Sequence, residues 1–168
     1  MMARASSHTT WRHRLAANIE ISAATPTDAG DIADIHLAAR GAAMPYLHRP
    51  FTDAETRDWF ASVVGDQSGK WWVARCGGRV AGYLMLDRQD LDHLYVHPAW
   101  QGRGVGTALL NHAKACNQHR LMLWTFQRNA NARSFYEAHG FRSAAVTDGQ
   151  NQEHEPDVQY VWEPSSHP

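Results

Sequence analysis

A glycine-rich stretch, Leu94–Leu110, has the residue types and spacing of an anion-binding loop. Gly102, Gly104 and Gly106 alternate along it, so no side chain separates the backbone from a ligand and a positive φ costs little. An apolar helix is expected directly after the loop, and its free N–H groups and the positive end of its dipole favour an anion there. The stretch therefore predicts a cradle for a phosphate or a pyrophosphate.

Two common nucleotide-binding loops do not fit this spacing. A dinucleotide-binding loop has the pattern G-x-G-x-x-G near the start of a βαβ unit, with an acidic residue at the end of the next strand. Here the pattern is G-x-G-x-G, and the next strand ends in Thr125-Phe126-Gln127. The Gly-Lys-Ser/Thr ending of a P-loop is absent as well.

Other reactive side chains lack the partners of a known site. His93 and His97 have a separation that could place both on one strand face, but neither an H-E-x-x-H motif nor a cysteine pair accompanies them. We therefore expect no metal. Cys116 falls on the apolar face of a predicted helix, which is typical of a packed thiol, and Ser134 lacks the G-x-S-x-G setting of a hydrolase.

The composition predicts one soluble, cytoplasmic domain. The chain has 168 residues, of which 43% are hydrophobic and 20% charged, as in ordinary globular proteins. Lys and Arg total 16 against 17 acidic residues, which argues against a broad basic surface for nucleic acid. The 2 cysteines cannot build a disulfide framework. No apolar run approaches the ~20 residues of a membrane helix.

The two ends of the chain lack the patterning of the middle. Residues 1–18 contain arginine, serine and threonine but no acid, which fits a flexible extension or, alternatively, an organellar transit peptide. We expect the folded domain to span residues 19–163 and residues 164–168 to form a tail.

The strands and helices that must position the loop alternate along the chain. Strands are expected at Ile19–Ala23, Trp71–Arg75, Val80–Leu86, Leu91–Val96, Arg120–Phe126, Phe141–Thr147 and Val158–Trp162. Helices are expected after Thr25–Asp28, after the capping box Thr52–Glu55, after the glycine loop, and over Ala132–His139. The order β-α-α-β-β-β-α-β-α-β-β predicts a single-domain α/β fold with a mixed sheet.

Glycine and proline mark the expected ends of these elements. Gly77-Gly78 is typical of a hairpin turn, Gly41 is expected to help stop the first helix, and Gly140 is placed as the C′ glycine of the last. Met44–Phe51, bounded by prolines, is predicted to be irregular. Asp148–Asp157 is predicted to be a polar loop.

Two motifs resemble the GNAT superfamily of acetyl-CoA-dependent N-acetyltransferases. Gln101–Gly106 matches the Gln/Arg-x-x-Gly-x-Gly signature of that family, and Asn129–Phe141 is similar to its second motif, Asn-x-x-Ala-x-x-Phe-Tyr-Glu-x-x-Gly-Phe. With the element order, the resemblance covers roughly Ile19 to Trp162. It implies a splayed sheet in which the strand that opens Leu94–Leu110 and the strand Arg120–Phe126 part to admit the pantetheine arm of coenzyme A.

The resemblance also implies the site residues. Backbone contacts with pantetheine are assigned to Leu94, Tyr95 and Val96, and the pyrophosphate is expected on the amides of Gln101, Gly102, Arg103, Gly104, Val105, Gly106 and Thr107. Asn129 is expected to hydrogen-bond the cofactor arm. Tyr136 is expected near the thioester sulfur as proton donor to the departing thiolate, although its helical spacing from Ala132 also suits a core aromatic residue.

Acetyl transfer to an amine requires an uncharged nucleophile, and a general base can supply it. Asp90, Asp92 and His93 lie on or before the central strand, and neighbouring residues on a strand point to opposite faces, so at most one of Asp92 and His93 faces the amine. His93 has the better-suited reference pKa, near ~6.5. A chain of water molecules in place of either residue remains an open alternative.

The resemblance also implies that the first two helices and the last hairpin recognise the acceptor. Residues that could line an apolar pocket or attract a cation are Tyr46, Phe51, Trp59, Trp71, Trp72, Glu153, Glu155 and Asp157. The predicted function is transfer of acetyl from acetyl-CoA to a primary amine, small-molecule or peptide, within a ternary complex. A non-catalytic acyl-CoA sensor, a protein-modifying acetyltransferase and a homodimer stay open; no nucleic-acid or membrane partner is expected.

Overall fold

The computed structural model describes residues 18–65 and 70–165. Its elements follow the predicted order: β1 (Ile19–Ala23), η1 (Pro26–Asp28), α1 (Ala29–Ala43), α2 (Asp53–Val63), β2 (Trp71–Cys76), β3 (Arg79–Asp87), β4 (Asp90–Val96), η2 (Pro98–Trp100), α3 (Val105–Cys116), β5 (Leu121–Phe126), α4 (Ala130–Ala138), β6 (Arg142–Thr147) and β7 (Asp157–Trp162). The predicted N-terminal extension up to residue 17, and residues 166–168 of the predicted tail, lie outside the described residues.

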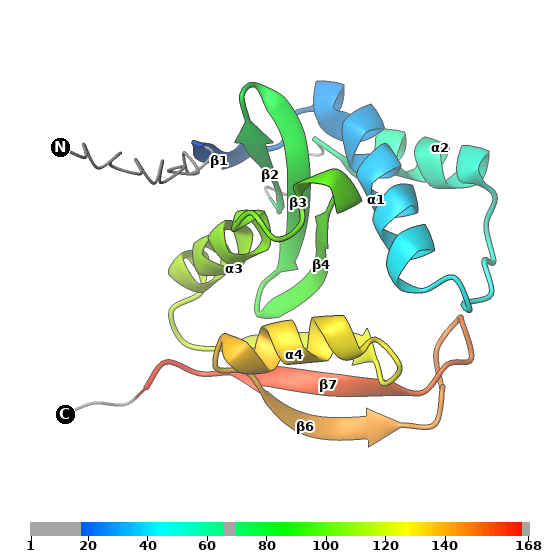
Figure 1. The fold of residues 1–168 in the computed structure, drawn as a ribbon, viewed down its shortest axis with the longest axis vertical. Coiled ribbons are helices and arrows are strands. Elements are labelled where there is room, and N and C mark those ends of the chain that lie inside the picture. Colours follow the sequence, from blue (N-terminus) through cyan, green and yellow to red (C-terminus); the bar gives the residue numbers. More distant parts are fainter. Residues whose placement is uncertain (1–17, 66–69, 166–168) are drawn as a thin grey trace, which may run out of the picture.

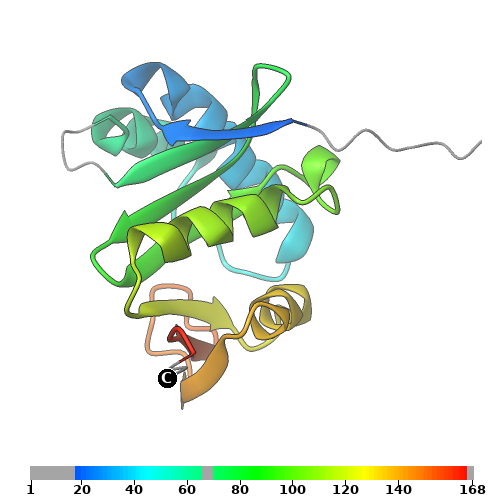
Figure 2. The ribbon, with the colours of Figure 1, turned by 90° about the vertical axis from the view of Figure 1, so that its left-hand side faces the viewer.

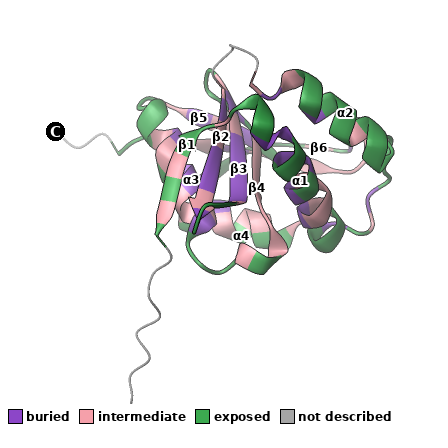
Figure 3. Cartoon of the chain, turned by 90° about the horizontal axis from the view of Figure 1, so that it is seen from above, coloured by how far each residue is buried: buried purple, intermediate pink, exposed green. Residues whose placement is uncertain are grey.

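The strands form one mixed sheet with the order β1-β2-β3-β4-β5-β7-β6 (Figure 1). The pairs are antiparallel except for β4 with β5, which run parallel. An apolar cluster joins α1 and α2 to one face of β2 and β3, and a second cluster joins α3 and α4 to the opposite face (Figure 2). The buried residues of β2 and β3 thus lie between helices on both sides (Figure 3).

The sheet splays open between β4 and β5. Their ladder consists of a single register pair, Asp90 with Met122, supported by a 2.8 Å hydrogen bond from the Met122 amide to the Gln89 carbonyl. Beyond this point Leu91–Val96 pairs with β3 and has no register with β5. The splayed, mixed α/β sheet implied by the family resemblance is therefore confirmed.

A β-bulge interrupts β4 at Asp92. Met85 of β3 pairs with His93 and the next residue, Leu86, pairs with Leu91, so Asp92 has no opposite residue. The extra residue reverses the alternation of side chains. Leu91 consequently packs with the α3 side of the sheet, while His93 contacts aromatic rings on the α1 and α2 side. Simple alternation along the strand did not predict this bulge.

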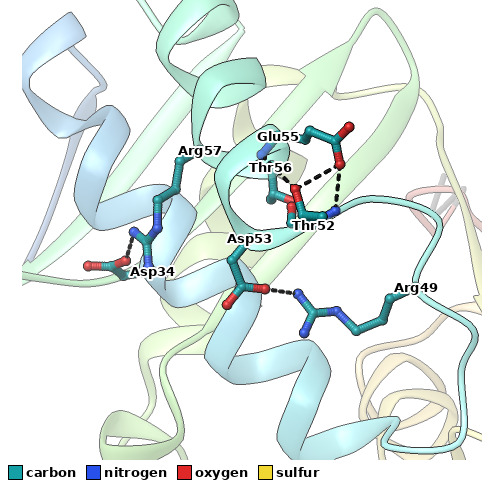
Figure 4. Close-up of polar contacts among 7 residues, drawn as sticks. All are labelled: Asp34, Arg49, Thr52, Asp53, Glu55, Thr56 and Arg57. Carbon is teal, nitrogen blue, oxygen red and sulfur yellow. Dashed lines mark hydrogen bonds and ion pairs between the residues drawn. The ribbon is translucent and has the colours of Figure 1, made fainter.

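Local residues explain where α1 ends and where α2 begins. The prediction that Gly41 helps stop α1 is wrong, because the helix continues to Ala43. Gly41 does not have a positive φ; instead Pro45 disfavours helical geometry at the preceding Met44, where α1 ends. The predicted capping box of α2 is present: the Glu55 amide donates to Thr52 Oγ1 at 3.2 Å, and the Thr52 amide donates to Glu55 Oε2 at 2.8 Å (Figure 4).

Among the described residues, no helix combines the length and the apolar character that crossing a membrane requires.

Candidate active site

The glycine loop presents unpaired backbone amides at the start of α3. Gly102 and Gly104 have φ of 69° and 86°, values that suit glycine. The first helical hydrogen bond runs from the Ala108 amide to the Gly104 carbonyl at 2.9 Å. The amides of Val105, Gly106 and Thr107 precede that bond and have no acceptor within the helix. The loop therefore has the geometry of the predicted anion cradle.

The surroundings of the loop leave its glycines accessible. A side chain built at Gly102 would meet no atom within 4 Å, and one at Gly104 would meet only the Ile19 methyl at 3.9 Å. Gln101 donates from its side-chain amide to the Val96 carbonyl at 3.1 Å, which ties the loop to the end of β4. Arg103 lies over the Trp100 ring, 5.1 Å from its centre.

Helix α4 packs against the start of α3 through Thr107, Phe135 and His139. The Phe135 carbonyl can only accept, so His139 Nδ1–H donates to it at 2.7 Å. His139 Nε2 then accepts from the Thr107 hydroxyl at 3.1 Å. Phe135 lies 3.4 Å from where a Cβ of Gly106 would be. The Thr107 hydroxyl is thus engaged within the protein, and its amide remains for a ligand.

Both residues assigned from the second motif lie on α4. The Asn129 side-chain oxygen accepts from the Ala132 amide at 3.2 Å, so this residue caps the helix and retains its side-chain NH₂ as a donor. Tyr136 is only 8% exposed and packs edge-on against Phe141 at 5.5 Å. Burial raises the pKa of Tyr136 well above its ordinary value, so its hydroxyl keeps its proton at neutral pH. A core role and a proton-donor role are both compatible with this placement.

His93, on the opposite face of the sheet, belongs to a hydrogen-bonded group of three side chains. The Tyr83 hydroxyl lies 3.1 Å from His93 Nδ1 and 2.8 Å from Nδ1 of His36 on α1. The ring of Trp59 stacks on His93 at 6.0 Å with an interplanar angle of 16°. The three elements α1, α2 and β4 therefore meet at His93.

The environment of this group keeps both histidines neutral. Burial, with the positive charge of Arg40 as a further cause, lowers the pKa of His93 to about 4. Burial foremost, and nearby cationic groups in addition, lower the pKa of His36 to about 3. At pH 7 both imidazoles are uncharged, so each has one nitrogen that accepts and one that donates.

The predicted acidic alternatives for a base lie elsewhere. Asp92 is exposed at the bulge, and burial together with the negative charges of Asp90 and Asp87 raises its pKa. Asp90 begins β4 and is exposed as well. Of the candidate bases Asp90, Asp92 and His93, only His93 lines the large cavity described next.

A cavity of about 760 Å³ opens beside His93. Its walls are the second half of α1, the predicted irregular segment after it, α2, β4 and the loop between β6 and β7. An ion pair of 2.8 Å between Arg40 and Glu153 joins α1 to that loop. Figure 1 shows the loop approaching the segment that connects α1 to α2.

Only part of the predicted acceptor residues reach this cavity. Phe51, Trp59 and Glu153 line it. Trp71 is buried in the apolar cluster under α1 and α2, and Trp72 packs on His112, 4.2 Å away on the other face. These two positions were assigned wrongly, because adjacent strand residues face opposite ways and the buried one fills the core.

The remaining predicted residues have partners of their own. Arg128 lies 3.8 Å from the centre of the Tyr46 ring and 3.5 Å from Glu155. Asp157 accepts hydrogen bonds from Thr147 and Asn151. The prediction of a loop that attracts a cation through free carboxylates therefore loses its support, since each carboxylate is paired within the chain.

Sequence reasoning missed His36, Arg40 and Tyr83. His36 lies one helical turn from Ile32, on the edge of the apolar stripe of α1, so its position on a buried face was a usable signal. Tyr83 stands in an apolar strand run, where a buried hydroxyl needs a partner. Among residues 18–65 and 70–165, no cluster of three or more His, Cys, Asp or Glu could hold a metal ion.

Comparison with known proteins agrees with this geometry. The family model described as an acetyltransferase (GNAT) domain matches residues 67–143. The probable N-acetyltransferase Rv2775 of Mycobacterium tuberculosis is 30% identical over 166 residues, which cover 89% of this chain and 87% of that protein.

Solved structures of low sequence identity share the fold. YjaB from Escherichia coli superposes with a TM-score of 0.72 at 22% identity, covering 85% of this chain and 96% of YjaB. YncA from Salmonella typhimurium, solved with its cofactor acetyl-CoA, superposes with a TM-score of 0.65 at 20% identity, covering 90% and 96% of the two chains. From its sequence relatives and its fold, the chain belongs to the GNAT family of N-acetyltransferases.

Proposed function

We propose that this enzyme transfers the acetyl group of acetyl-CoA to a primary amine by direct attack within a ternary complex. The observation that carries the proposal is the position of β4. Its free edge, Leu91–Val96, leads at one end into the glycine loop, and its His93 lines the cavity on the other face. One strand therefore joins an anion cradle to a pocket able to take an amine.

The residues of the cradle fit coenzyme A. The amides of Val105, Gly106 and Thr107 are free of helical acceptors, and the glycines of the loop leave the space in front of them open. Backbone amides at a helix N-terminus donate hydrogen bonds to phosphate groups, of which coenzyme A has two in its pyrophosphate. The free edge of β4 at Leu94–Val96 offers backbone groups to an extended amide-containing arm. When bound, acetyl-CoA supplies an activated thioester.

His93 is proposed as the general base. Its Nδ1 is engaged with Tyr83, which leaves Nε2 for the amine. A histidine that is neutral at pH 7 can accept the proton that the amine loses as it attacks. Asp92 is not proposed for this role, since it lies at the exposed bulge and does not line the cavity.

Tyr136 is proposed to donate a proton to the departing thiolate, and Asn129 to hydrogen-bond the cofactor arm. The raised pKa of Tyr136 keeps the proton on its hydroxyl until a strong base appears beside it. Both assignments rest on the family resemblance and on these placements.

The proposal is tested by release of coenzyme A thiol with a panel of primary amines. The exposed Cys116 reacts with thiol reagents, so its background is subtracted from a reaction without amine. We expect amine-dependent release and an acetylated amine in the mass spectrum. Tight binding of acetyl-CoA without turnover on any amine would support the alternative of a non-catalytic acyl-CoA sensor.

Gly104→Glu is expected to weaken acetyl-CoA binding at least about 100-fold, because it places bulk and negative charge in the cradle. Isothermal titration calorimetry measures the affinity. Gly30→Glu is the matched control: it adds the same charge on α1 at a position with no atom within 4 Å. Because Gly104 has a positive φ, Gly104→Asn checks that the backbone tolerates a side chain. If Gly104→Glu bound acetyl-CoA as tightly as the wild type, the proposal that the glycine loop binds the phosphates would be wrong.

Tyr136→Phe is expected to lower kcat about tenfold or more while the KM for acetyl-CoA changes little, since a proton donor acts in the transition state. The phenyl ring still fills the core. Steady-state kinetics separate the two constants, and Tyr160→Phe, a buried hydroxyl removed from β7, serves as the control. Equal kcat values for wild type and Tyr136→Phe would leave this residue only its packing role.

His93→Gln is expected to lower kcat/KM about 100-fold or more, whereas Asp92→Asn should leave it close to wild type. With the amine concentration expressed as free base, the wild-type rate should stay level from pH 8 to about pH 5 and fall toward pH 4. The sign follows from the base, which must be unprotonated and has a pKa of about 4. A half-maximal rate near pH 6.5, or a loss in Asp92→Asn alone, would contradict the assignment.

A further inference from the structure

The cavity beside His93 has apolar walls. The apolar and aromatic residues that line it are Leu37, Met44, Pro45, Leu47, Pro50, Phe51, Trp59 and Phe60. Phe51 and Trp59 are 55% and 46% exposed, which makes them two of the large hydrophobic side chains that the described residues leave in contact with solvent. Covering this apolar surface with a ligand removes it from water, which is favourable.

Each charged side chain that lines the cavity already has a partner within the chain. Arg40 pairs with Glu153 at 2.8 Å. Arg49 pairs with Asp53, the first residue of α2 (Figure 4). Glu55 accepts hydrogen bonds from the backbone and hydroxyl of Thr52, at 2.8 and 2.7 Å, as the same figure shows.

These pairings leave the wall of the cavity without net charge. Arg40 and Arg49 balance Glu55 and Glu153 among its lining residues, and both histidines are neutral. A carboxylate on the acceptor would lose water and find both arginines already paired, which is costly. A second ammonium would find only Glu55 without a cationic partner, and an oxygen of that carboxylate already accepts hydrogen bonds from Thr52. Polyamines and free amino acids are therefore poorly matched to this cavity.

We propose that the acceptor is an arylalkylamine: a small monoamine with an uncharged aromatic body. This inference rests on the proposed function and narrows its substrate. Trp59 stacks on His93, so a ring seated against the exposed part of Trp59 would hold the amine of a short alkyl chain near the proposed base. Aromatic contacts of this kind stabilise a bound ring beyond what the buried area alone contributes.

The test compares kcat/KM for 2-phenylethylamine, phenylalanine, spermidine and a short lysine peptide, with coenzyme A release as the readout. We expect 2-phenylethylamine to exceed each of the others at least tenfold. Trp59→Ala should raise its KM about tenfold or more with little change in the KM for acetyl-CoA. Trp124→Ala is the matched control, since Trp124 is 49% exposed on β5 and does not line the cavity.

Three outcomes are distinguishable. A higher kcat/KM for spermidine, phenylalanine or the peptide would overturn the substrate class and leave the acetyltransferase activity intact. An equal KM for 2-phenylethylamine in Trp59→Ala and wild type would overturn the stacking argument. Failure of every amine to release coenzyme A would instead count against the proposed function.

A separate observation concerns the proton that His93 would accept. Tyr83 is fully buried, and its single hydroxyl proton serves two neighbours, Nδ1 of His36 and Nδ1 of His93. A hydroxyl can donate to one nitrogen and accept from an N–H at the other. When both rings are neutral, one histidine therefore carries its proton on Nδ1 and the other on Nε2.

We infer that Tyr83 and His36 form a proton relay behind His93, which again rests on the proposed function. At the start, His93 Nδ1–H donates to Tyr83, whose hydroxyl donates to His36 Nδ1; His93 Nε2 is free. As Nε2 takes the proton of the amine, the Nδ1 proton passes to the Tyr83 oxygen and the Tyr83 proton passes to His36. Tyr83 ends neutral, and the charge passes to His36, whose ring centre is 5.7 Å from that of His93. Because the pKa of His36, about 3, is below that of His93, about 4, His36 holds the proton only transiently.

The relay moves positive charge from the His93 imidazole to His36, away from the amine that is being acetylated. His36 lines the same cavity, so it can return its extra proton to solvent. In this scheme His93 is the catalytic residue, and Tyr83 and His36 are positioning residues that act through it. Tyr83 and His36 should therefore affect the tautomers of the imidazoles as well as kcat.

Tyr83→Phe is expected to lower kcat at least about tenfold and to change the dependence of kcat on the D₂O fraction from curved to linear, because only one proton then moves. Long-range ¹H–¹⁵N spectra at pH 7 should show opposite tautomers for His36 and His93 in the wild type. Tyr160→Phe is the control, since it removes another fully buried hydroxyl, which bonds to Glu137 and Arg133.

His36→Asn provides a second variant in case Tyr83→Phe folds poorly, and it should show the same linear dependence on D₂O. Identical tautomers in the wild type would overturn the relay. So would an active Tyr83→Phe with wild-type kcat and a curved dependence. A wild type that acetylates no amine would count against the proposed function. The tautomers would even then show whether Tyr83, His36 and His93 are hydrogen-bonded as the relay requires.

Discussion

The parting of β4 from β5 is the constraint on which the rest of the site depends. After the single pair of Asp90 with Met122, one edge of β4 has no strand beside it. Backbone groups that lack partners inside a protein are costly, so this edge needs water or a ligand. The helices beyond the gap hold it open: α4 packs on α3 through the Thr107–His139 hydrogen bond and the contact of Phe135 with Gly106. The glycine loop, which follows β4 and leads into α3, lies at the end of this free edge.

The two faces of β4 have different electrostatic characters. On the α3 side, helix amides and their dipole favour negative charge. On the α1 and α2 side, burial and Arg40 keep His36 and His93 neutral, and ion pairs with Glu153 and Asp53 neutralise the two arginines of the cavity wall. A pyrophosphate and an uncharged amine would each meet suitable surroundings on either side of the same strand. The bulge at Asp92 makes this division possible, because it turns His93 toward the cavity and leaves the carboxylate in water.

Much of this fold was predictable from local patterns. The capping box at Thr52, the glycine loop and the glycine after α4 each act through the backbone of adjacent residues, and the helices and strands they delimit are found where expected. Two of the predictions were wrong, each for its own reason. Gly41 does not stop α1, because a glycine ends a helix only where the chain requires its unusual geometry. Trp71 and Trp72 were both assigned to the pocket, although alternation allows at most one of two neighbours to reach it.

The amino-acid sequence alone specified the element order, the glycine loop and the family, because glycine spacing, caps and apolar periodicity are properties of neighbouring residues. The cavity beside His93 required the tertiary structure. The hydrogen bond between Tyr83 and His36 joins residues 47 positions apart in the sequence, and that between Arg40 and Glu153 joins residues 113 positions apart. No local pattern predicts either contact. Which histidine is buried, which carboxylate is neutralised and which tryptophan stays exposed depend on how α1, α2 and the β6–β7 loop pack together. Burial and pairing set the charge of each group, so the chemistry of the cavity was decided only by the folded chain.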